Sequence, residues 1–387
     1  MNPPTYPNRF RCIGSDCEDT CCQGWQITVD KPAFDRLTES PLKQIALTSI
    51  QVRPHSTNPT QYAQMALRSD GTCPFLNPNK LCAVHATLGP ESLPLGCRIY
   101  PRVLNRIDAQ IESSLSLSCP EAARLVLLTP DLLGVTGKQS LKAFDRKFAA
   151  LAAPATTLSQ LFWPLRHLHI AILLDPALTI GQRIQTLGQL AHATTSSKQT
   201  PREILKNFRH SPPNPPPETI NHSKALNSLD ALLAGPVASP RFTQTIARFL
   251  TGIQFSPTAS LESLASSLQS AESDHLQPFL LQHPQLLRNY LINYILRSLY
   301  PFGTISGTQS SPVLEFQILQ TQFSMMYALL AGVAAFHNRQ FTSAHAIETI
   351  QSFCRATEHH SAHLPDRPPV LLKPQTAAPE QTSPIPA

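Results

Sequence analysis

Eight of the nine cysteines lie in the first third of the chain, and their thiols are the groups best suited to chemistry. Four fall within CIGSDCEDTCC, from Cys12 to Cys22, with the spacing C-x4-C-x3-C-C. A free cysteine usually behaves as a small buried hydrophobe, which does not explain such crowding. Thiolates that converge on a metal do explain it, because the chain must supply each soft ligand. The candidate metal ligands are Cys12, Cys17, Cys21, Cys22, Cys73, Cys82, Cys97 and Cys119.

A disulfide framework is the main alternative, and the expected compartment argues against it. The N-terminal MNPPTYPNRFR lacks the apolar stretch of a secretory signal, so we expect a cytoplasmic protein whose thiols stay reduced. An odd total of nine cysteines also leaves one unpaired. Cys354 lies far from the others and is expected to be a packing residue. No run approaches about 18 consecutive apolar residues, so no membrane span is predicted.

The residues beside the later cysteines suit a shielded, charged metal site. Proline and two apolar residues follow Cys73, and apolar cover of this kind shields a metal from solvent. Arg98 follows Cys97, and its positive charge favours the ionised thiolate; a surface ion pair is the alternative. Cys119 precedes a proline at a predicted helix start, where a cysteine has a lowered pKa. We include Arg98 among the candidate cofactor-binding residues.

Periodicity predicts a mainly α fold, with a cysteine-rich metal-binding region and a short β-hairpin before a helical domain. A strand is expected at 25–29, then a helix capped by Asp30, then a hairpin at 102–117 that turns near 105–108. We place domain boundaries at 1–125, 126–364 and a disordered Pro-rich tail at 365–387. Apolar residues at three and four spacing predict helices at 161–174, 180–190, 242–250, 261–268, 286–302 and 313–337.

Composition excludes several other classes of protein. The 387 residues include 37 prolines and 14 glycines, which suits helices broken by Pro-rich connections. No glycine-rich nucleotide loop of the G-x-G-x-x-G or Walker type occurs. The formal charge is +6, but the basic residues are scattered and form no stripe with interleaved aromatics. We therefore expect no nucleic-acid partner.

One predicted helix, at 286–302, carries a polar face that suits a binding pocket. Asn289 and Asn293 are four residues apart, as are Tyr290 and Tyr294, so the members of each pair share a face. Amides beside tyrosines on an apolar helix are typical of a small-molecule pocket. Core tyrosines with satisfied hydroxyls are the alternative explanation. The four residues are the candidate cofactor-binding or substrate-binding set.

Several of these segments together resemble a known family. The chain resembles the bacterial flagellin lysine-N-methylases, and its cysteine cluster is also similar to small zinc- or iron-chelating proteins. The resemblance covers most of residues 9–303, includes all eight clustered cysteines, and is absent from the Pro-rich connectors and the tail. The matching segments are FRCIGSDCEDTCCQGW (10–25), CPFL (73–76), PLGCRIYP (94–101), SLSCPEAAR (116–124) and NYLINYILRSLYPF (289–302).

The resemblance implies methyl transfer from S-adenosylmethionine to lysine ε-amines on flagellin, in an enzyme with a [4Fe-4S] cluster. It assigns no catalytic residue. The C-x3-C-x2-C motif of radical enzymes is missing, so radical and polar transfer both stay open. Eight thiolates exceed the four that one cluster needs, so a second metal exists or some are structural. Because adjacent Cys21 and Cys22 point different ways in an extended backbone, at most one should bind beside Cys17.

Two other functions use the same thiolates. A zinc-stabilised interaction protein would hold the metal in closed, four-coordinate sites without any chemistry. An electron-transfer protein would use an iron–sulfur cluster without a methyl donor. The colour of the purified protein separates zinc from iron–sulfur, because only the latter is brown.

Overall fold

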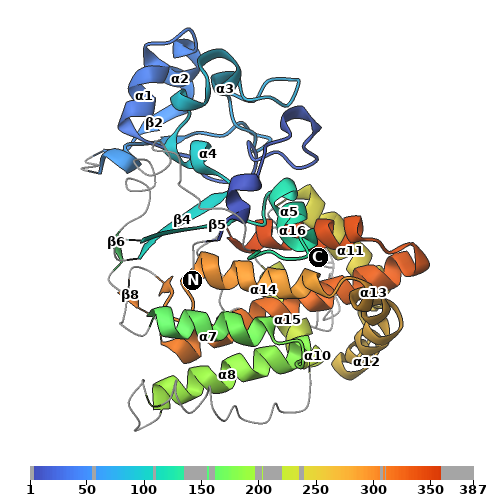
Figure 1. Cartoon of the computed structure of the whole chain (residues 1–387). Helices are drawn as coiled ribbons and strands as arrows, with labels where there is room; N and C mark the ends of the chain where they lie inside the picture. The colour runs from blue at the N-terminus through green and yellow to red at the C-terminus, as the bar shows by residue number, and fades with distance from the viewer. Residues whose placement is uncertain are drawn as a thin grey trace, which may run out of the picture.

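The computed structural model describes residues 4–54, 58–107, 110–134, 155–156, 162–196, 203, 220–234, 239–305, 308–309 and 311–358. These residues form a small N-terminal lobe and a larger body of helices, with a β-hairpin at their junction (Figure 1). Most of the described elements are helices, which confirms the predicted mainly helical class.

The small lobe is built around a three-stranded antiparallel sheet with the order β1-β3-β2. Its own hydrophobic core runs from Ile27 to Val84 and includes Cys73. The Asp30 side chain accepts a hydrogen bond from the Ala33 amide, so the predicted cap of the first helix is confirmed. The predicted strand at 25–29 is shorter than expected. The elements are β1 (Thr28–Val29), α1 (Lys31–Thr38), α2 (Lys43–Ser49), β2 (Ile50–Val52), β3 (Ala63–Met65), α3 (Ala83–Leu88) and α4 (Leu95–Ile99).

The predicted hairpin is present as β4 (Arg102–Ile107) and β5 (Gln110–Leu115). Ile107 pairs with Gln110, so the turn comes after residue 107 and the predicted turn near 105–108 was placed too early. In the sequence, the alternation of Ile107, Ala109 and Ile111 continues past the end of β4, so the pattern did not mark the turn. A two-residue strand that was not predicted, β6 (Ala155–Thr156), pairs with β4 in parallel. Helix α5 (Pro120–Leu128) follows with Cys119 as its N-cap, as predicted.

The helical body surrounds one long apolar helix, α15 (Pro312–His337), which contacts most of the other helices (Figure 1). All six predicted helices begin within two residues of their predicted starts, and the one at 286–302 ends early, at Ser298, because Leu299 adopts a left-handed conformation. The other helices are α7 (Phe162–Leu174), α8 (Ile180–Ser196), α10 (His222–Leu233), α11 (Pro240–Gly252), α12 (Leu261–Ala271), α13 (Gln277–Gln282), α14 (Gln285–Ser298) and α16 (Ser343–Glu358), with a π-helical turn at Glu272–Leu276 and a small hairpin of β7 (Thr304–Ile305) and β8 (Thr308–Gln309).

Helices α11 and α15 approach so closely that their contact needs glycine. A Cβ atom on Gly252 would lie 1.8 Å from the carbonyl oxygen of Gly332. A Cβ atom on Gly332 would lie 2.4 Å from the Phe249 ring. Either side chain would have to displace backbone or a buried aromatic ring, so the two glycines set this helix packing.

Helix α15 with its following turn, Pro312–Gln340, is the one described helix whose length and composition would allow it to cross a membrane. About three-quarters of the most apolar window, 72%, is buried inside the protein. The apolar character of α15 is therefore used in the core of the helical body.

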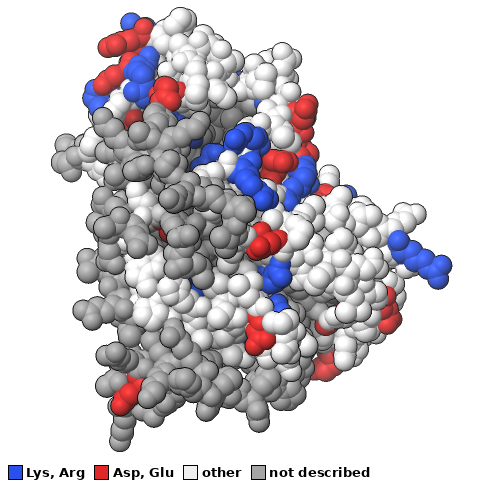
Figure 2. Space-filling model, viewed as in Figure 1, with Lys and Arg blue, Asp and Glu red and all other residues white. Residues whose placement is uncertain are grey.

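The main hydrophobic core also includes residues that precede the predicted helical domain. Tyr6 and Phe10 pack into it, as do Leu115, Leu117 and the apolar face of α5. The predicted boundary at residue 125 stays a prediction, and the predicted tail at 365–387 lies outside the described residues. On the face shown in Figure 2, basic side chains lie interspersed with acidic ones around the small lobe and its junction with the body.

Candidate functional site

The cysteine loop from Cys12 to Cys22 is fastened to α16 by buried polar contacts. Arg355 forms an ion pair with Asp19 at 2.9 Å and donates a hydrogen bond to the Thr20 carbonyl at 3.0 Å. Gln351, one turn earlier on α16, donates to the other Asp19 oxygen at 2.7 Å. More than 300 residues separate these partners in sequence. Helix α16 therefore positions the cysteine loop, and no local sequence pattern predicts this role.

Two further helices contact the same loop through the side chain of Glu18. Its carboxylate forms an ion pair with Arg124 on α5 and lies 3.8 Å from Arg241 on α11. Within the loop, the indole N–H of Trp25 donates to the Cys21 carbonyl oxygen. The loop is thus anchored at several points to the helical body.

Four thiols gather between the end of this loop and the small lobe, and we call Cys22, Cys73, Cys82 and Cys97 the inner cysteine set. The Cys73 amide donates to the Cys22 carbonyl at 2.8 Å, which brings the two chain segments together. A hydrogen bond with the Cys21 thiol and burial raise the pKa of the Cys22 thiol to about 12, while a hydrogen bond with Cys82 opposes the shift. Burial, followed by the charges of the other three members, raises the pKa of the Cys97 thiol. All four side chains therefore interact.

A second group, which we call the outer cysteine set, comprises Cys12, Cys17 and Cys119. The lowered pKa expected for Cys119 is wrong: burial raises the pKa of its thiol to about 12, the neighbouring Cys17 and Cys12 add to the rise, and the amides at the start of α5 oppose it only in part. Cys21 lies between the two sets, because it contacts Cys22 and its charge also acts on Tyr100, which is next to Cys119. In this arrangement Cys22 belongs to the inner set and Cys17 to the outer set, which agrees with the expectation that Cys21 and Cys22 do not both bind beside Cys17. That expectation stays a prediction.

The two sets offer the donors that a thiophilic metal needs. Among the described residues, no three Cys, His, Asp or Glu side chains already stand at the spacing of a metal site. Burial raises the pKa of Cys73, Cys97 and Cys119, neighbouring thiolates add to the rise, and a bound cation removes that repulsion. Soft, neighbouring, partly buried thiols fit zinc or an iron–sulfur cluster, and binding would draw them closer together.

Arg98 follows Cys97 of the inner set in the chain, but its side chain pairs with a carboxylate. Its guanidinium forms an ion pair with Glu91 at 2.6 Å, on the loop after α3. The ion-pair alternative weighed for this residue is therefore present in the structure. Its predicted role in binding a cofactor stays a prediction.

The two asparagines of α14 anchor the helix to the hairpin and to α5. Asn289 donates to the carbonyl oxygens of Val126 and Thr129 at 2.9 and 2.6 Å. Asn293 donates to the Leu115 carbonyl at 2.8 Å and accepts a hydrogen bond from the Tyr6 hydroxyl at 2.6 Å. The amides of both residues are therefore committed to protein partners.

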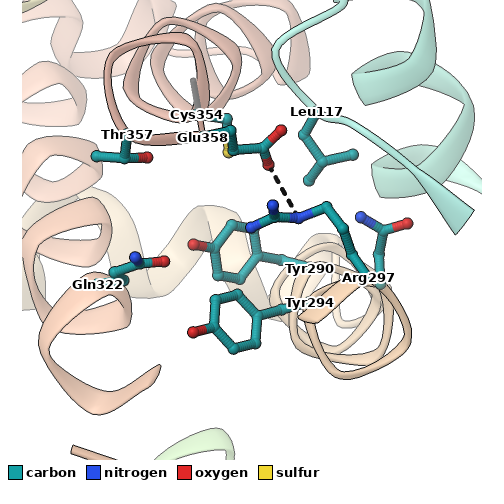
Figure 3. A pocket seen from close by; sticks show the side chains of 9 residues that line it. Leu117, Tyr290, Tyr294, Arg297, Gln322, Cys354, Thr357 and Glu358 are labelled. Atoms are coloured by element: carbon teal, nitrogen blue, oxygen red, sulfur yellow. Dashed lines mark ion pairs between the residues drawn. The ribbon is translucent and has the colours of Figure 1, made fainter. Parts of the chain in front are cut away.

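The two tyrosines of α14 line a small cavity between α14, α15 and α16 (Figure 3). Their rings extend toward the side on which Gln322 lies, and the Arg297 guanidinium faces the Glu358 carboxylate. The free volume is about 10 Å³, close to the room that one water molecule needs. The lining residues are Leu117, Tyr290, Asn293, Tyr294, Arg297, Gln322, Cys354, Thr357 and Glu358.

A buried ion pair gives this cavity its charge. Arg297 Nε lies 3.4 Å from a Glu358 oxygen, and the guanidinium also stacks 5.8 Å from the Tyr294 ring centre. The Ser116 hydroxyl, at the end of the hairpin, donates to the same carboxylate. Burial raises the pKa of both Tyr290 and Tyr294, so their hydroxyls stay protonated.

Helix α16 connects the two candidate sites. Gln351 and Arg355 hold the cysteine loop, while Cys354 and Glu358 line the tyrosine cavity. The residues missed by the sequence interpretation, Arg297, Glu358 and Arg355, are polar residues near helix ends, where exposure is the usual expectation. Their burial depends on tertiary packing that local pattern does not reveal.

Taken together, the geometry defines a protein with a cysteine-rich N-terminal region on a helical body. Residues 11–120 match the model of a zinc- or iron-chelating domain named for its CxxCxxCC pattern. Residues 166–367, just over half of the chain, match the model of the FliB lysine N-methylase C-terminal domain. The chain therefore belongs to the FliB lysine N-methylase family, and the resemblance of the cysteine and α14 segments is confirmed.

Curated relatives agree with this family. The chain is 34% identical over 142 residues to the lysine-N-methylase of Salmonella typhimurium, a region that covers 36% of this chain and 35% of that protein. It is also 34% identical over 144 residues to the flagellar biosynthetic protein FliU of Salmonella muenchen, covering 36% of this chain and 84% of FliU. The match thus spans about a third of the lysine-N-methylase. No solved structure matches the chain.

Proposed function

We propose that the protein transfers methyl groups from S-adenosylmethionine to lysine ε-amines, and that its protein substrate is flagellin. The match of residues 166–367 to the FliB lysine N-methylase model carries this proposal. Relatives named lysine-N-methylase and flagellar biosynthetic protein support the reaction and the flagellar substrate. We place the reaction in the cytoplasm, because thiolates must stay reduced to hold a metal.

The metal in this proposal is a [4Fe-4S] cluster, with zinc as the alternative. Four thiolates hold one such cluster, so the inner cysteine set would hold one. The outer set together with Cys21 supplies four more thiols for a second metal or a structural role. When bound, an iron–sulfur cluster supplies redox chemistry and a Lewis-acidic iron, whereas closed zinc sites supply stability.

The acceptor lysine, in this proposal, enters at the tyrosine cavity. In a polar transfer the ammonium must lose its proton before nitrogen can attack, and an apolar, buried site lowers its pKa toward that state. The hydroxyls of Tyr290 and Tyr294 would orient the neutral amine without adding charge. Arg297, which lines the same cavity, would oppose a second positive charge there and so favour the neutral amine. Because the free volume is only about 10 Å³, these side chains must move apart for entry.

Incubation of the purified protein with flagellin and S-adenosylmethionine, followed by peptide mass spectrometry, tests the reaction. The proposal expects methylated lysines that depend on the donor and on the intact protein. Metal-loaded protein that leaves every flagellin lysine unmodified would contradict it. A brown protein without methyl transfer would favour the electron-transfer alternative instead.

The Tyr294→Phe variant tests the cavity separately, because it removes one hydroxyl and keeps the ring. Lost methylation with an unchanged thermal midpoint and metal content would support the acceptor pocket. Full activity in this variant would refute that pocket while leaving the proposed reaction intact.

A further inference from the structure

A second group of buried polar side chains lies at the contact between α7, β5 and the residues after α14. Arg166 and His169 are three residues apart on α7, and each is 1% exposed. Arg166 donates from Nη1 to Glu112 on β5. The rings of His169 and Tyr300 meet edge to face, with centres 4.8 Å apart. These contacts join the four side chains into one cluster inside the protein.

Several polar atoms of this cluster have no hydrogen-bond partner among the described residues. They are Nε and Nη2 of Arg166, Nδ1 of His169 and the hydroxyl of Tyr300. The hydroxyl of Ser114 is unpartnered too, and Ser114 faces the same side of β5 as Glu112, two residues earlier. Buried polar groups in folded proteins are nearly always satisfied, and a buried cation costs most when it is not. Four such atoms on three side chains of the cluster, with a fifth on the same face of the neighbouring strand, indicate a site built for a polar ligand.

The arginine determines which ligand group fits. With Nη1 engaged by Glu112, the Nε and Nη2 edge presents two parallel N–H donors, the arrangement that binds a carboxylate through both oxygens. Burial and the charge of Arg166 lower the pKa of His169 to about 3, so the imidazole is neutral. A neutral imidazole can accept a hydrogen bond at one nitrogen.

The net charge of the cluster further restricts the class of ligand that it can bind. Arg166 and Glu112 already neutralise each other, so a simple anion would leave an uncompensated negative charge in a dry site. An α-amino acid group brings one carboxylate and one ammonium, and adds no net charge. Its carboxylate suits the free edge of Arg166, while Glu112 and His169 Nδ1 suit its ammonium. A zwitterionic amino acid group therefore fits this cluster better than phosphate.

We propose that Arg166, with His169, Tyr300 and Ser114, binds the α-amino acid group of a small ligand, and that this ligand is the methyl donor. The identity of the ligand rests on the proposed function, because S-adenosylmethionine ends in a methionine α-carboxylate and α-amine. The polar face of the hairpin continues from Ser114 to Ser116, whose hydroxyl donates to Glu358 at the tyrosine cavity. This buried face thus leads from the proposed donor site to the proposed acceptor site.

Calorimetric titration with two probes tests the site. S-adenosylhomocysteine keeps the amino acid group, whereas methylthioadenosine lacks it. In the Arg166→Gln/Glu112→Gln double variant, which removes both buried charges together, affinity for S-adenosylhomocysteine should fall about 10- to 100-fold, the range for lost charged hydrogen bonds. Affinity for methylthioadenosine should stay unchanged. The matched control is Arg248→Gln/Glu348→Gln, a partly exposed pair between α11 and α16, which should bind both probes normally.

The outcomes separate this inference from the proposed function. If the wild-type protein binds neither probe and methylates nothing, the proposed function fails. If S-adenosylhomocysteine binds the double variant as tightly as the wild type, or if both probes weaken equally, the amino acid site is overturned and the reaction stands. Should the double variant not fold, Tyr300→Phe and Ser114→Ala remove single hydroxyls. Each should weaken S-adenosylhomocysteine several-fold, and unchanged affinity in both would mean that the cluster holds only water.

Discussion

At the scale of single residues, Cys354 differs from the clustered cysteines in having no other thiol among the groups that shift its pKa. Its side chain is 2% exposed in the core, and burial, followed by the charge of Glu358, raises the pKa of its thiol. No other cysteine contributes to that shift, unlike the shifts within the inner and outer sets. A lone thiol lacks the further soft ligands that a metal site needs.

We therefore expect Cys354→Ser to keep the metal content of the wild-type protein. Its main effect should be a loss of about 1 kcal/mol in the free energy of unfolding, as for most core substitutions. Cys73→Ser, in the inner set, is the matched comparison and should lower metal content. Elemental analysis of both purified variants measures this. Metal lost from Cys354→Ser would show that the site is not confined to the N-terminal cysteines.

His169 makes the folded protein sensitive to mild acid. Burial and Arg166 lower the pKa of its imidazole to about 3 in the folded state, whereas the unfolded value is about 6.5. Below about pH 6.5 the unfolded chain takes up a proton that the folded chain refuses, so stability falls as the pH falls toward about 3. At about pH 5 this single group should cost about 2 kcal/mol.

Urea unfolding of ligand-free wild type and His169→Gln, at about pH 7.5 and about pH 5, measures this contribution. The variant should lose less stability than the wild type between the two pH values, since other groups titrate equally in both. Identical losses would mean that His169 titrates normally in the folded protein.

At the scale of elements, α14 shows how a polar helix face can be used for anchoring. Asn293 meets the backbone of Leu115 with both of its amide atoms and also accepts from Tyr6. Asn289 donates from its amide nitrogen to the carbonyl oxygens of Val126 and Thr129 at the end of α5. The i,i+4 spacing predicted shared faces correctly, but it could not show that the amide face meets backbone while the tyrosine face meets the cavity.

Asn293→Ala should destabilise the protein strongly, because it leaves the Tyr6 hydroxyl and the Leu115 amide and carbonyl without a buried partner. We expect a loss of about 3 kcal/mol in the free energy of unfolding, from buried groups left unsatisfied at about 1 to 3 kcal/mol each. Tyr294→Phe, on the other face of the helix, should change stability by less than about 1 kcal/mol. Chemical denaturation compares them, and equal stability of the two variants would contradict the anchoring role.

Element starts were predictable where the signal is local. The caps at Asp30 and Ser239 and the proline after Cys119 lie within one turn of the groups that they satisfy. The strand β6 was missed because two residues carry no periodicity, and its partner Arg106 is far along the chain. Contacts between segments that are far apart in the sequence leave no periodic pattern in either segment.

At the scale of the whole molecule, α16 ties the cysteine loop to the helical body. The charged residues of the cysteine loop are ordinary in sequence, yet Asp19 and Glu18 meet Arg355 and Arg124 in partly buried pairs. One trace of such burial was visible: Arg166 and His169 interrupt an otherwise apolar helix. Identifying the partner of each still required the fold.

Replacing Arg355 should loosen the metal region without touching any cysteine. Arg355→Met removes an ion pair with Asp19 and hydrogen bonds to two loop carbonyls, of Thr20 and Gln23. We expect a loss of about 3 kcal/mol in stability and metal affinity about tenfold weaker, as for other supporting contacts of metal ligands. The control Arg248→Met breaks a pair between α11 and Glu348 of α16, and this pair does not contact the loop. Chelator titration that finds equal metal affinity in the two variants would contradict this coupling.

The most direct test of the central claim, that the clustered thiols hold an iron–sulfur centre, is the visible spectrum and metal content of protein purified without oxygen. The account predicts a brown protein with broad visible absorption, containing iron and acid-labile sulfide that are lost when Cys73 and Cys97 of the inner set are replaced by serine. A colourless protein with stoichiometric zinc, or with no metal at all, would contradict it.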